Sequence, residues 1–133
     1  KMSKSLNNAI LLSDDEETIK GKLRKAVTDP QKLRKNDPGR PEVCLVFTYH
    51  NKFNPEDVDE IADGCRSGAL GCVDCKMKCT DGINKFLSPI RDKRHELENN
   101  MNYVKDVLAD GEGKAKLIAD KTMSEVREKM QLG

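Results

Sequence analysis

The sequence is poor in residues that mark several common classes of protein. It contains no tryptophan, and only 4% of its 133 residues are aromatic. No run of apolar residues approaches the length needed to span a bilayer, so we expect no membrane segment. The sequence also lacks a secretion signal, and its cysteine count of five is odd, so disulfides are a weak expectation.

Neither sign of charge dominates. Lysine and arginine number 24 against 23 acidic residues, which gives a formal net charge of +1 and excludes a strong general affinity for nucleic acid. A local basic patch could still bind RNA, and it has to be identified by position. The length suits one domain. Because the chain begins Lys1-Met2, without an initiator methionine, we expect a fragment of a longer protein.

All five cysteines lie in one stretch, with the spacing C-x20-C-x6-C-x2-C-x3-C from Cys44 to Cys79. A C-x2-C pair brings two sulfurs within reach of one metal centre, and two more thiolates complete a four-sulfur site. Such sites hold zinc or an iron–sulfur cluster, and the ligand type alone does not separate them. On a helix, Cys75 and Cys79 share one face and compete for a single ligand position. The alternative is five reduced thiols in a core.

Apolar spacing predicts an all-α fold built as a helical bundle. A capping box at 13–16 predicts a helix that runs to about Val27, with Ile19 and Leu23 also in its buried stripe. Residues 9–12 read as a brief strand or a packed turn. The other face of this first helix is expected to be solvated, with RNA contact as the alternative. It carries the basic residues Lys20, Lys22, Arg24 and Lys25.

Further signals divide the rest of the chain. Three prolines and a glycine within residues 28–41 predict a linker, and residues 42–51 suit a helix or a strand. Asn54-Pro55 predicts a helix start, and another helix should begin near Cys72. We expect Pro89 to kink or interrupt that helix, and residues 111–113 to form a turn before the last one.

The first five residues, Lys1 to Ser5, read KMSKS. Two lysines and two hydroxyls suit an ordinary polar segment, or a mobile loop whose ammonium groups neutralise a polyphosphate. The five letters are identical to the second signature of class I aminoacyl-tRNA synthetases. The ordered set that follows resembles the bacterial tryptophanyl-tRNA synthetases over essentially the whole chain. It comprises Ala9–Leu12, Ala26–Asp29, Pro38–Cys44, Val46–His50, Gly71–Lys76, Leu87–Arg91 and Glu125–Met130.

The resemblance implies an enzyme that activates tryptophan with ATP and Mg²⁺, transfers it to tRNA(Trp), and works in the cytoplasm as a homodimer through an N-terminal domain that this chain lacks. By the family pattern, Lys1 and Lys4 stabilise the charge that develops as pyrophosphate leaves. Ser3 and Ser5 help to hold the phosphates of ATP, and the Met2 backbone lies near the nucleotide. Residues 1–27 would be the KMSKS loop and the end of a Rossmann-like catalytic domain, and residues 28–133 a helical anticodon-binding domain.

The resemblance also implies a metal centre. A subset of the family carries a [4Fe–4S] cluster on C-x22-C-x6-C-x2-C, which corresponds here to Cys44, Cys65, Cys72 and Cys75, with Cys79 as a spare and zinc as the alternative metal. The chain lacks the first signature of class I enzymes, of the His-Ile-Gly-His type, so we expect it to be inactive alone. The competing interpretation is a stand-alone metal-binding helical interaction module whose KMSKS match is accidental.

Overall fold

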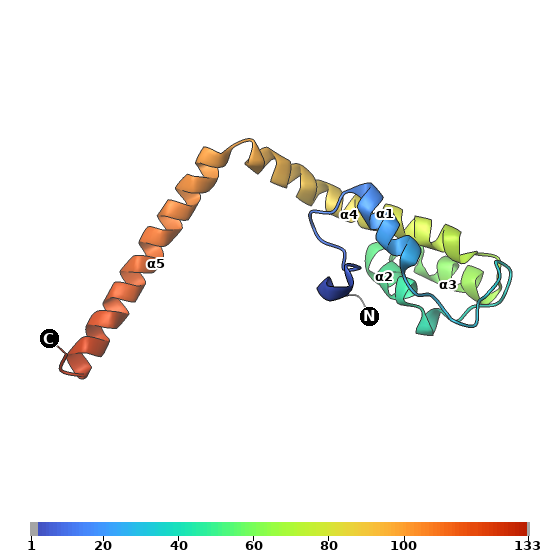
Figure 1. The fold of residues 1–133 in the computed structure, drawn as a ribbon, viewed down its shortest axis with the longest axis horizontal. Helices are drawn as coiled ribbons and strands as arrows, with labels where there is room; N and C mark the ends of the chain where they lie inside the picture. The colour runs from blue at the N-terminus through green and yellow to red at the C-terminus, as the bar shows by residue number, and fades with distance from the viewer. Residues whose placement is uncertain (1–2, 133) are drawn as a thin grey trace. The chain divides into compact units, whose positions relative to one another are not determined.

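The computed structural model describes residues 3–132, and every regular element in that range is a helix. The all-α prediction is therefore confirmed. None of the described helices combines the length and apolar character that a bilayer span requires. In chain order the elements are η1 (Lys4–Leu6), α1 (Glu16–Lys25), η2 (Pro41–Val43), α2 (Leu45–Phe53), α3 (Val58–Arg66), α4 (Cys72–Glu98) and α5 (Met101–Lys129) (Figure 1).

The chain divides into two compact units, residues 1–91 and 92–133. The first unit has one hydrophobic core, to which α1, α2 and α4 contribute. Its fully buried apolar side chains are Ile19, Leu23, Val46, Cys79, Ile83 and Leu87. The predicted stripe of the first helix is thus right for Ile19 and Leu23. It is wrong for Val27, which lies beyond the end of α1 and is exposed.

The start of α1 differs from the predicted capping box. Asp15, rather than Ser13, is the N-cap, and its carboxylate accepts a hydrogen bond from the Thr18 backbone N–H at 2.8 Å. The acids Glu16 and Glu17 then occupy the first turn, where the helix dipole favours negative charge. The side chain of Asp14 is used elsewhere, as described below.

Two local ambiguities are resolved by the structure. Residues 9–12 form no strand, and Asp14 donates its backbone N–H to the Leu11 carbonyl in a turn. The segment 42–51 is largely helical, because α2 begins at Leu45. Asn54 closes α2 as its C-cap instead of starting the next helix, and α3 begins only at Val58.

The second unit carries α5, and none of its described residues is buried. The expected turn at residues 111–113 is wrong, because α5 runs without a break through both glycines. An ion pair between Lys114 and Asp110 spans Gly111 and Gly113 on one helix face. Of the two expectations for Pro89, the interruption is wrong, since the 27-residue helix α4 continues through it, and the kink stays a prediction.

Candidate functional site

The ends of three helices carry the four predicted cysteine ligands. Cys44 is the N-cap of α2, Cys65 lies in the last turn of α3, and Cys72 and Cys75 occupy the first two turns of α4. The connection between α3 and α4 turns at Gly68, whose φ is +77°. A Cβ there would lie 2.3 Å from the Asn36 carbonyl oxygen, so only glycine fits this turn.

Cys44 and Cys72 lie close enough to Cys65 and Cys75 to affect the pKa values of these two thiols. Burial, followed by the nearby Cys44, Cys65 and Cys72, raises the pKa of Cys75 to about 12. Burial is also the main reason why the pKa of Cys65 is raised, and Cys44 and Cys72 add to it. A thiol of this kind stays protonated at neutral pH until an electrophilic metal displaces its proton.

A buried cation accompanies these thiols. Lys32 is only 7% exposed, and its ammonium group donates to the Asp37 carbonyl. Its charge lowers the pKa values of Cys65 and Cys75, against the larger effect of burial. Gly39 lies beside it and would place a Cβ 2.6 Å from the Cys65 sulfur. The backbone therefore packs directly against this sulfur, and a cation faces the group.

The fifth cysteine has a different environment. Cys79 belongs to the hydrophobic core, where its Sγ lies 4.0 Å from the Val46 carbonyl oxygen, and burial raises its pKa to about 12. His50, also fully buried, uses Nδ1 toward Asn54 Oδ1 at 3.1 Å and Nε2 toward the Cys75 carbonyl at 3.2 Å. Both ring nitrogens of His50 thus have partners within the protein.

Among residues 3–132, no group of three or more His, Cys, Asp or Glu side chains stands where it could hold a metal ion. A single zinc ion needs its sulfurs about 2.3 Å from the metal, and hence close to one another. The described residues therefore contain no preformed ion site that would support either zinc or a cluster. What the described residues provide is a looser group of four thiols.

The KMSKS segment lies at the start of the first unit. Lys1 and Met2 fall outside the described residues, and the same holds for the side chain of Lys4. The backbone N–H of Ser3 donates to Asn8 Oδ1 at 2.7 Å, and its Oγ lies 3.1 Å from Ser5 Oγ. The structure thus brings the two serine hydroxyls together, while the roles of Lys1, Met2 and Lys4 stay predictions.

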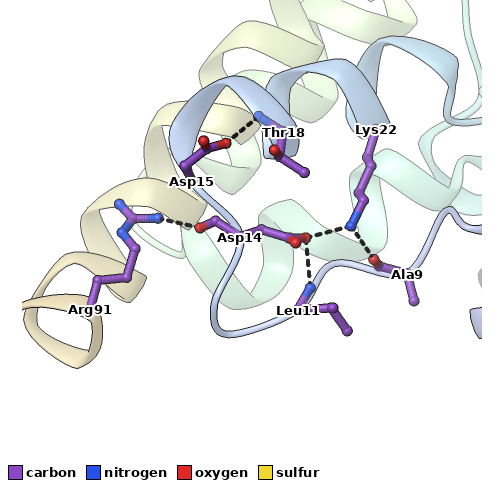
Figure 2. A network of polar contacts seen from close by, with 7 residues as sticks. All are labelled: Ala9, Leu11, Asp14, Asp15, Thr18, Lys22 and Arg91. Atoms are coloured by element: carbon purple, nitrogen blue, oxygen red, sulfur yellow. Dashed lines mark hydrogen bonds and ion pairs between the residues drawn. The ribbon is translucent and has the colours of Figure 1, made fainter. Parts of the chain in front are cut away.

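A polar network follows this segment (Figure 2). Lys22 of α1 donates from Nζ to Asp14 Oδ2 at 2.6 Å and to the Ala9 carbonyl at 2.8 Å. Burial is the largest single effect and by itself would raise the pKa of Asp14. The hydrogen bonds from Lys22 and from the Leu11 backbone, together with the charge of Lys22, outweigh it, and the pKa is lowered. The expectation of a solvated lysine face is wrong for Lys22. Its partners lie 8 and 13 residues away, beyond what a helical pattern reveals.

A shallow hollow opens beside Cys72. It is lined by Lys32, Leu33, Arg34, Lys35, Gly71, Cys72, Val73 and Asp74. Leu33 is 85% exposed and Val73 68% exposed, an unusual position for apolar side chains. Lys35 pairs with Asp74 at 3.4 Å, and both side chains are largely exposed. The hollow therefore combines exposed basic and apolar groups next to the cysteines.

Comparisons with known proteins agree with this architecture. The profile of the family "tRNA synthetases class I (W and Y)" matches residues 1–88. The tryptophan–tRNA ligase of Aquifex aeolicus is 48% identical over 99% of this chain and 34% of its own length, and that of Deinococcus radiodurans 41% identical over 98% and 40%. The crystal structure of tryptophanyl-tRNA synthetase from Campylobacter jejuni superposes with a TM-score of 0.87 at 29% identity, covering 99% of this chain and 42% of that one.

The fold and the matches define an all-helical segment that corresponds to the C-terminal part of solved tryptophanyl-tRNA synthetase structures. The chain belongs to the class I tRNA synthetases of the tryptophan and tyrosine type. It spans between about a third and two fifths of the length of the relatives given above.

Proposed function

We propose that this chain is the C-terminal portion of a tryptophan–tRNA ligase, an enzyme that activates tryptophan with ATP and Mg²⁺ and transfers it to tRNA(Trp). The observation that carries this proposal is the similarity to tryptophan–tRNA ligases along 98–99% of the chain. A solved relative at TM-score 0.87 contains ADP and tryptophan. By the same argument, the enzyme is a cytoplasmic homodimer, and the chain alone is inactive.

Within this function, the KMSKS segment holds the phosphates of ATP. Lys1 and Lys4 place ammonium groups against the charge that develops on the leaving pyrophosphate, which is electrostatic stabilisation without a covalent intermediate. The hydroxyls of Ser3 and Ser5, 3.1 Å apart, support a role as paired donors to phosphate oxygens. The Met2 backbone lies beside the nucleotide in this proposal.

The test is tryptophan-dependent exchange of pyrophosphate into ATP by the full-length protein. Lys4→Ala should lower the exchange rate by about 10²-fold, the loss typical of removing one donor to a developing anion. Lys20→Ala is the matched control, since Lys20 lies on the surface of α1 and pairs with Glu17 at 3.4 Å. Exchange stimulated by another amino acid, or by none, would contradict the proposed substrate.

The helical region supplies the tRNA contact in this proposal. The hollow beside Cys72 suits RNA, because Arg34 and Lys35 can pair with phosphates while exposed Leu33 and Val73 can contact bases or ribose. The double change Arg34→Ala and Lys35→Ala should weaken tRNA(Trp) binding and reduce its salt dependence, while amino-acid activation stays unchanged. Equal binding of cognate and non-cognate tRNA at fixed salt would favour the alternative, a helical metal-binding interaction module.

We also propose that Cys44, Cys65, Cys72 and Cys75 hold a [4Fe–4S] cluster, with Cys79 outside the ligand set. Three observations support the fit: three other thiols close enough to raise the pKa of Cys75, a buried lysine that balances an anionic centre, and Gly39 packed against the Cys65 sulfur. A four-iron cluster is larger than one ion, so a loose group of thiols suits it better than it suits zinc. These four cysteines, at the start of α2, the end of α3 and the start of α4, would hold the cluster and anchor it to three helices.

Protein purified without oxygen tests this proposal by its visible absorption and its iron and sulfide content. Cys72→Ser and Cys75→Ser should lose colour and iron, whereas Cys79→Ser should keep both because Cys79 lies in the core. One zinc per chain would overturn the identity of the metal. Metal-free wild-type protein would overturn the site and leave the ligase proposal standing.

A further inference from the structure

The segment that follows the KMSKS signature is fixed to the helical body by a partly buried lysine. The Nζ of Lys22 lies 2.8 Å from the Ala9 carbonyl and 2.6 Å from Asp14 Oδ2. The side chains of Lys22 and Asp14 are only 14% and 9% exposed. The same Asp14 oxygen accepts the backbone N–H of Leu11 at 2.8 Å. One ammonium group and one carboxylate thus hold residues 9–14 against α1.

Arg91 of α4 extends the attachment across the chain. Its Nη1 donates to the Asp14 backbone carbonyl at 3.2 Å and to Asn84 Oδ1 at 3.2 Å. Asn84 therefore orients the guanidinium group that binds the turn before α1. Figure 2 shows Arg91 and Lys22 approaching Asp14 from opposite sides. The turn is held by side chains from two helices, of which one lies 77 residues further along the chain.

The attachment continues to the signature itself. Asn8, the neighbour of Ala9, accepts the backbone N–H of Ser3 at 2.7 Å. An unbroken series of hydrogen bonds and peptide links thus runs from Arg91 through Asp14, Lys22 and Ala9 to Ser3. This series of contacts connects residues 9–14 with Ser3 in the KMSKS segment.

We infer that Lys22, Asp14 and Arg91 are positioning residues for the activation of the amino acid, and that they set where the KMSKS lysines stand relative to the helical body. The inference rests on the proposed role of these lysines. None of the three contacts the nucleotide in this scheme, and each acts through the backbone of residues 9–14. Electrostatic stabilisation depends on geometry, and a misplacement of about 1 Å can cost about 10²-fold in rate.

Lysine is well suited to this position. Its ammonium group has three donors, of which two bind Ala9 and Asp14 in a site with little water. Lys22→Met keeps the length and bulk of the side chain and removes the charge and the donors. Lys22→Arg restores both, although its planar group cannot reproduce the lysine geometry fully. The pair of variants separates the hydrogen bonds from the volume of the side chain.

The experiment measures ATP–pyrophosphate exchange by the full-length ligase, with the rates expressed per folded molecule. Lys22→Met should lower kcat at least tenfold and leave the KM for tryptophan and the affinity for tRNA unchanged. Lys22→Arg should recover part of the loss. Lys20→Met is the matched control on the same helix and should behave as wild type, because its pair with Glu17 is exposed. Arg91→Gln should lower kcat in the same direction.

The possible failures are distinguishable. If Lys22→Met loses thermal stability yet keeps its kcat per folded molecule, the network is structural only and the inference is overturned. Should Lys22→Met fail to fold, Arg91→Gln decides, because Arg91 binds the backbone carbonyl of Asp14 and not the carboxylate that pairs with Lys22. A wild-type protein without tryptophan-dependent exchange would overturn the proposed function and this inference with it.

Discussion

The two units of this chain use similar helical patterns with opposite outcomes. In residues 1–91, apolar residues at helical spacing on α1 are fully buried, as Ile19 and Leu23 are. In α5, apolar residues at helical spacing are exposed, including Met123 at 49% and Val126 at 39%. Periodicity shows which residues share a helix face. It does not show whether another element covers that face.

The polar groups repeat this contrast. Lys22–Asp14 and Lys114–Asp110 are both ion pairs of 2.6 Å. The first pair is 14% and 9% exposed and also binds backbone groups, while the second is 73% and 63% exposed and stands alone on its helix. Although the two distances are equal, the interaction energies of the two pairs differ, because water screens the second pair and is largely excluded from the first.

The largest effect should come from the core of the first unit. Leu23→Ala removes a side chain that is 0% exposed, so we expect a loss of about 2–5 kcal/mol in the free energy of unfolding. Denaturant unfolding measures it. The chain has two tyrosines and no tryptophan, so a Tyr103→Phe background leaves Tyr49, which packs against the core, as the fluorescent reporter of the first unit.

Leu117→Ala is the matched change in the second unit. The side chain is already exposed, and alanine has the higher helix propensity, so we expect a change within about 0.5 kcal/mol. In a Tyr49→Phe background, the fluorescence of Tyr103 during denaturant unfolding measures this change. A loss as large as that of Leu23→Ala would mean that the side of α5 that carries Leu117 is covered in solution, and the contrast between the units would fail.

A smaller effect is expected from the buried ion pair. Lys22→Met leaves Asp14 with one hydrogen bond to its carboxylate and leaves the Ala9 carbonyl without its lysine donor, so we expect a loss of about 1.5–3 kcal/mol. Unfolding of the first unit, read from Tyr49, is the measurement. A loss equal to that of the exposed Lys20→Met would show that the site is open to water.

These contrasts explain how far the sequence could predict the structure. The all-α class and the buried pair Ile19 and Leu23 follow from local spacing, and the start of α4 at Cys72 follows from the cluster of glycines before it. The pairing of Lys22 with Asp14, and of Arg91 with the Asp14 carbonyl, depends on tertiary packing and leaves no local signal. The same holds for the buried position of Lys32, whose neighbours Arg34 and Lys35 are exposed.

The continuity of α5 shows a different limit. Each glycine costs about 1 kcal/mol relative to alanine within a helix, so Gly111 and Gly113 were expected to break it. The 29-residue helix has enough residues of high helix propensity before Gly111 and after Gly113 to offset the cost of the two glycines. Conversely, Asn54 and Pro55 carry a strong start signal, yet Asn54 completes α2 by donating its N–H to the His50 carbonyl.

A pH-dependent difference is expected from Asp29 in the first unit. Hydrogen bonds from the Arg40 side chain, and then from the Gln31 backbone, hold the pKa of Asp29 well below its usual value of 3.8. Its contribution to stability is therefore complete above about pH 4 and is lost as the pH falls toward the lower pKa of the folded state. The melting temperature should fall more steeply below pH 4 in the wild type than in Asp29→Asn.

The control for this comparison is Arg40→Lys. It keeps a positive charge but loses the two-atom contact of Arg40 Nε and Nη2 with the carboxylate, so the steep acid dependence should be reduced without disappearing. Identical acid profiles of wild type and Asp29→Asn would contradict the role given to the ion pair.

The smallest effect is expected from the exposed pair of α5. Lys114→Ala removes a contact between residues i and i+4 whose side chains are mostly in water, so we expect a change of about 0.3–0.5 kcal/mol that disappears at high salt. The measurement is the unfolding of α5, followed through Tyr103 in the Tyr49→Phe background at low and at high ionic strength. A loss above about 1 kcal/mol that persists in salt would require the pair to be shielded from water. Because shielding needs a covering surface, that result would mean that this face of α5 packs against another part of the full-length protein, as the core face of α1 packs against α2 and α4.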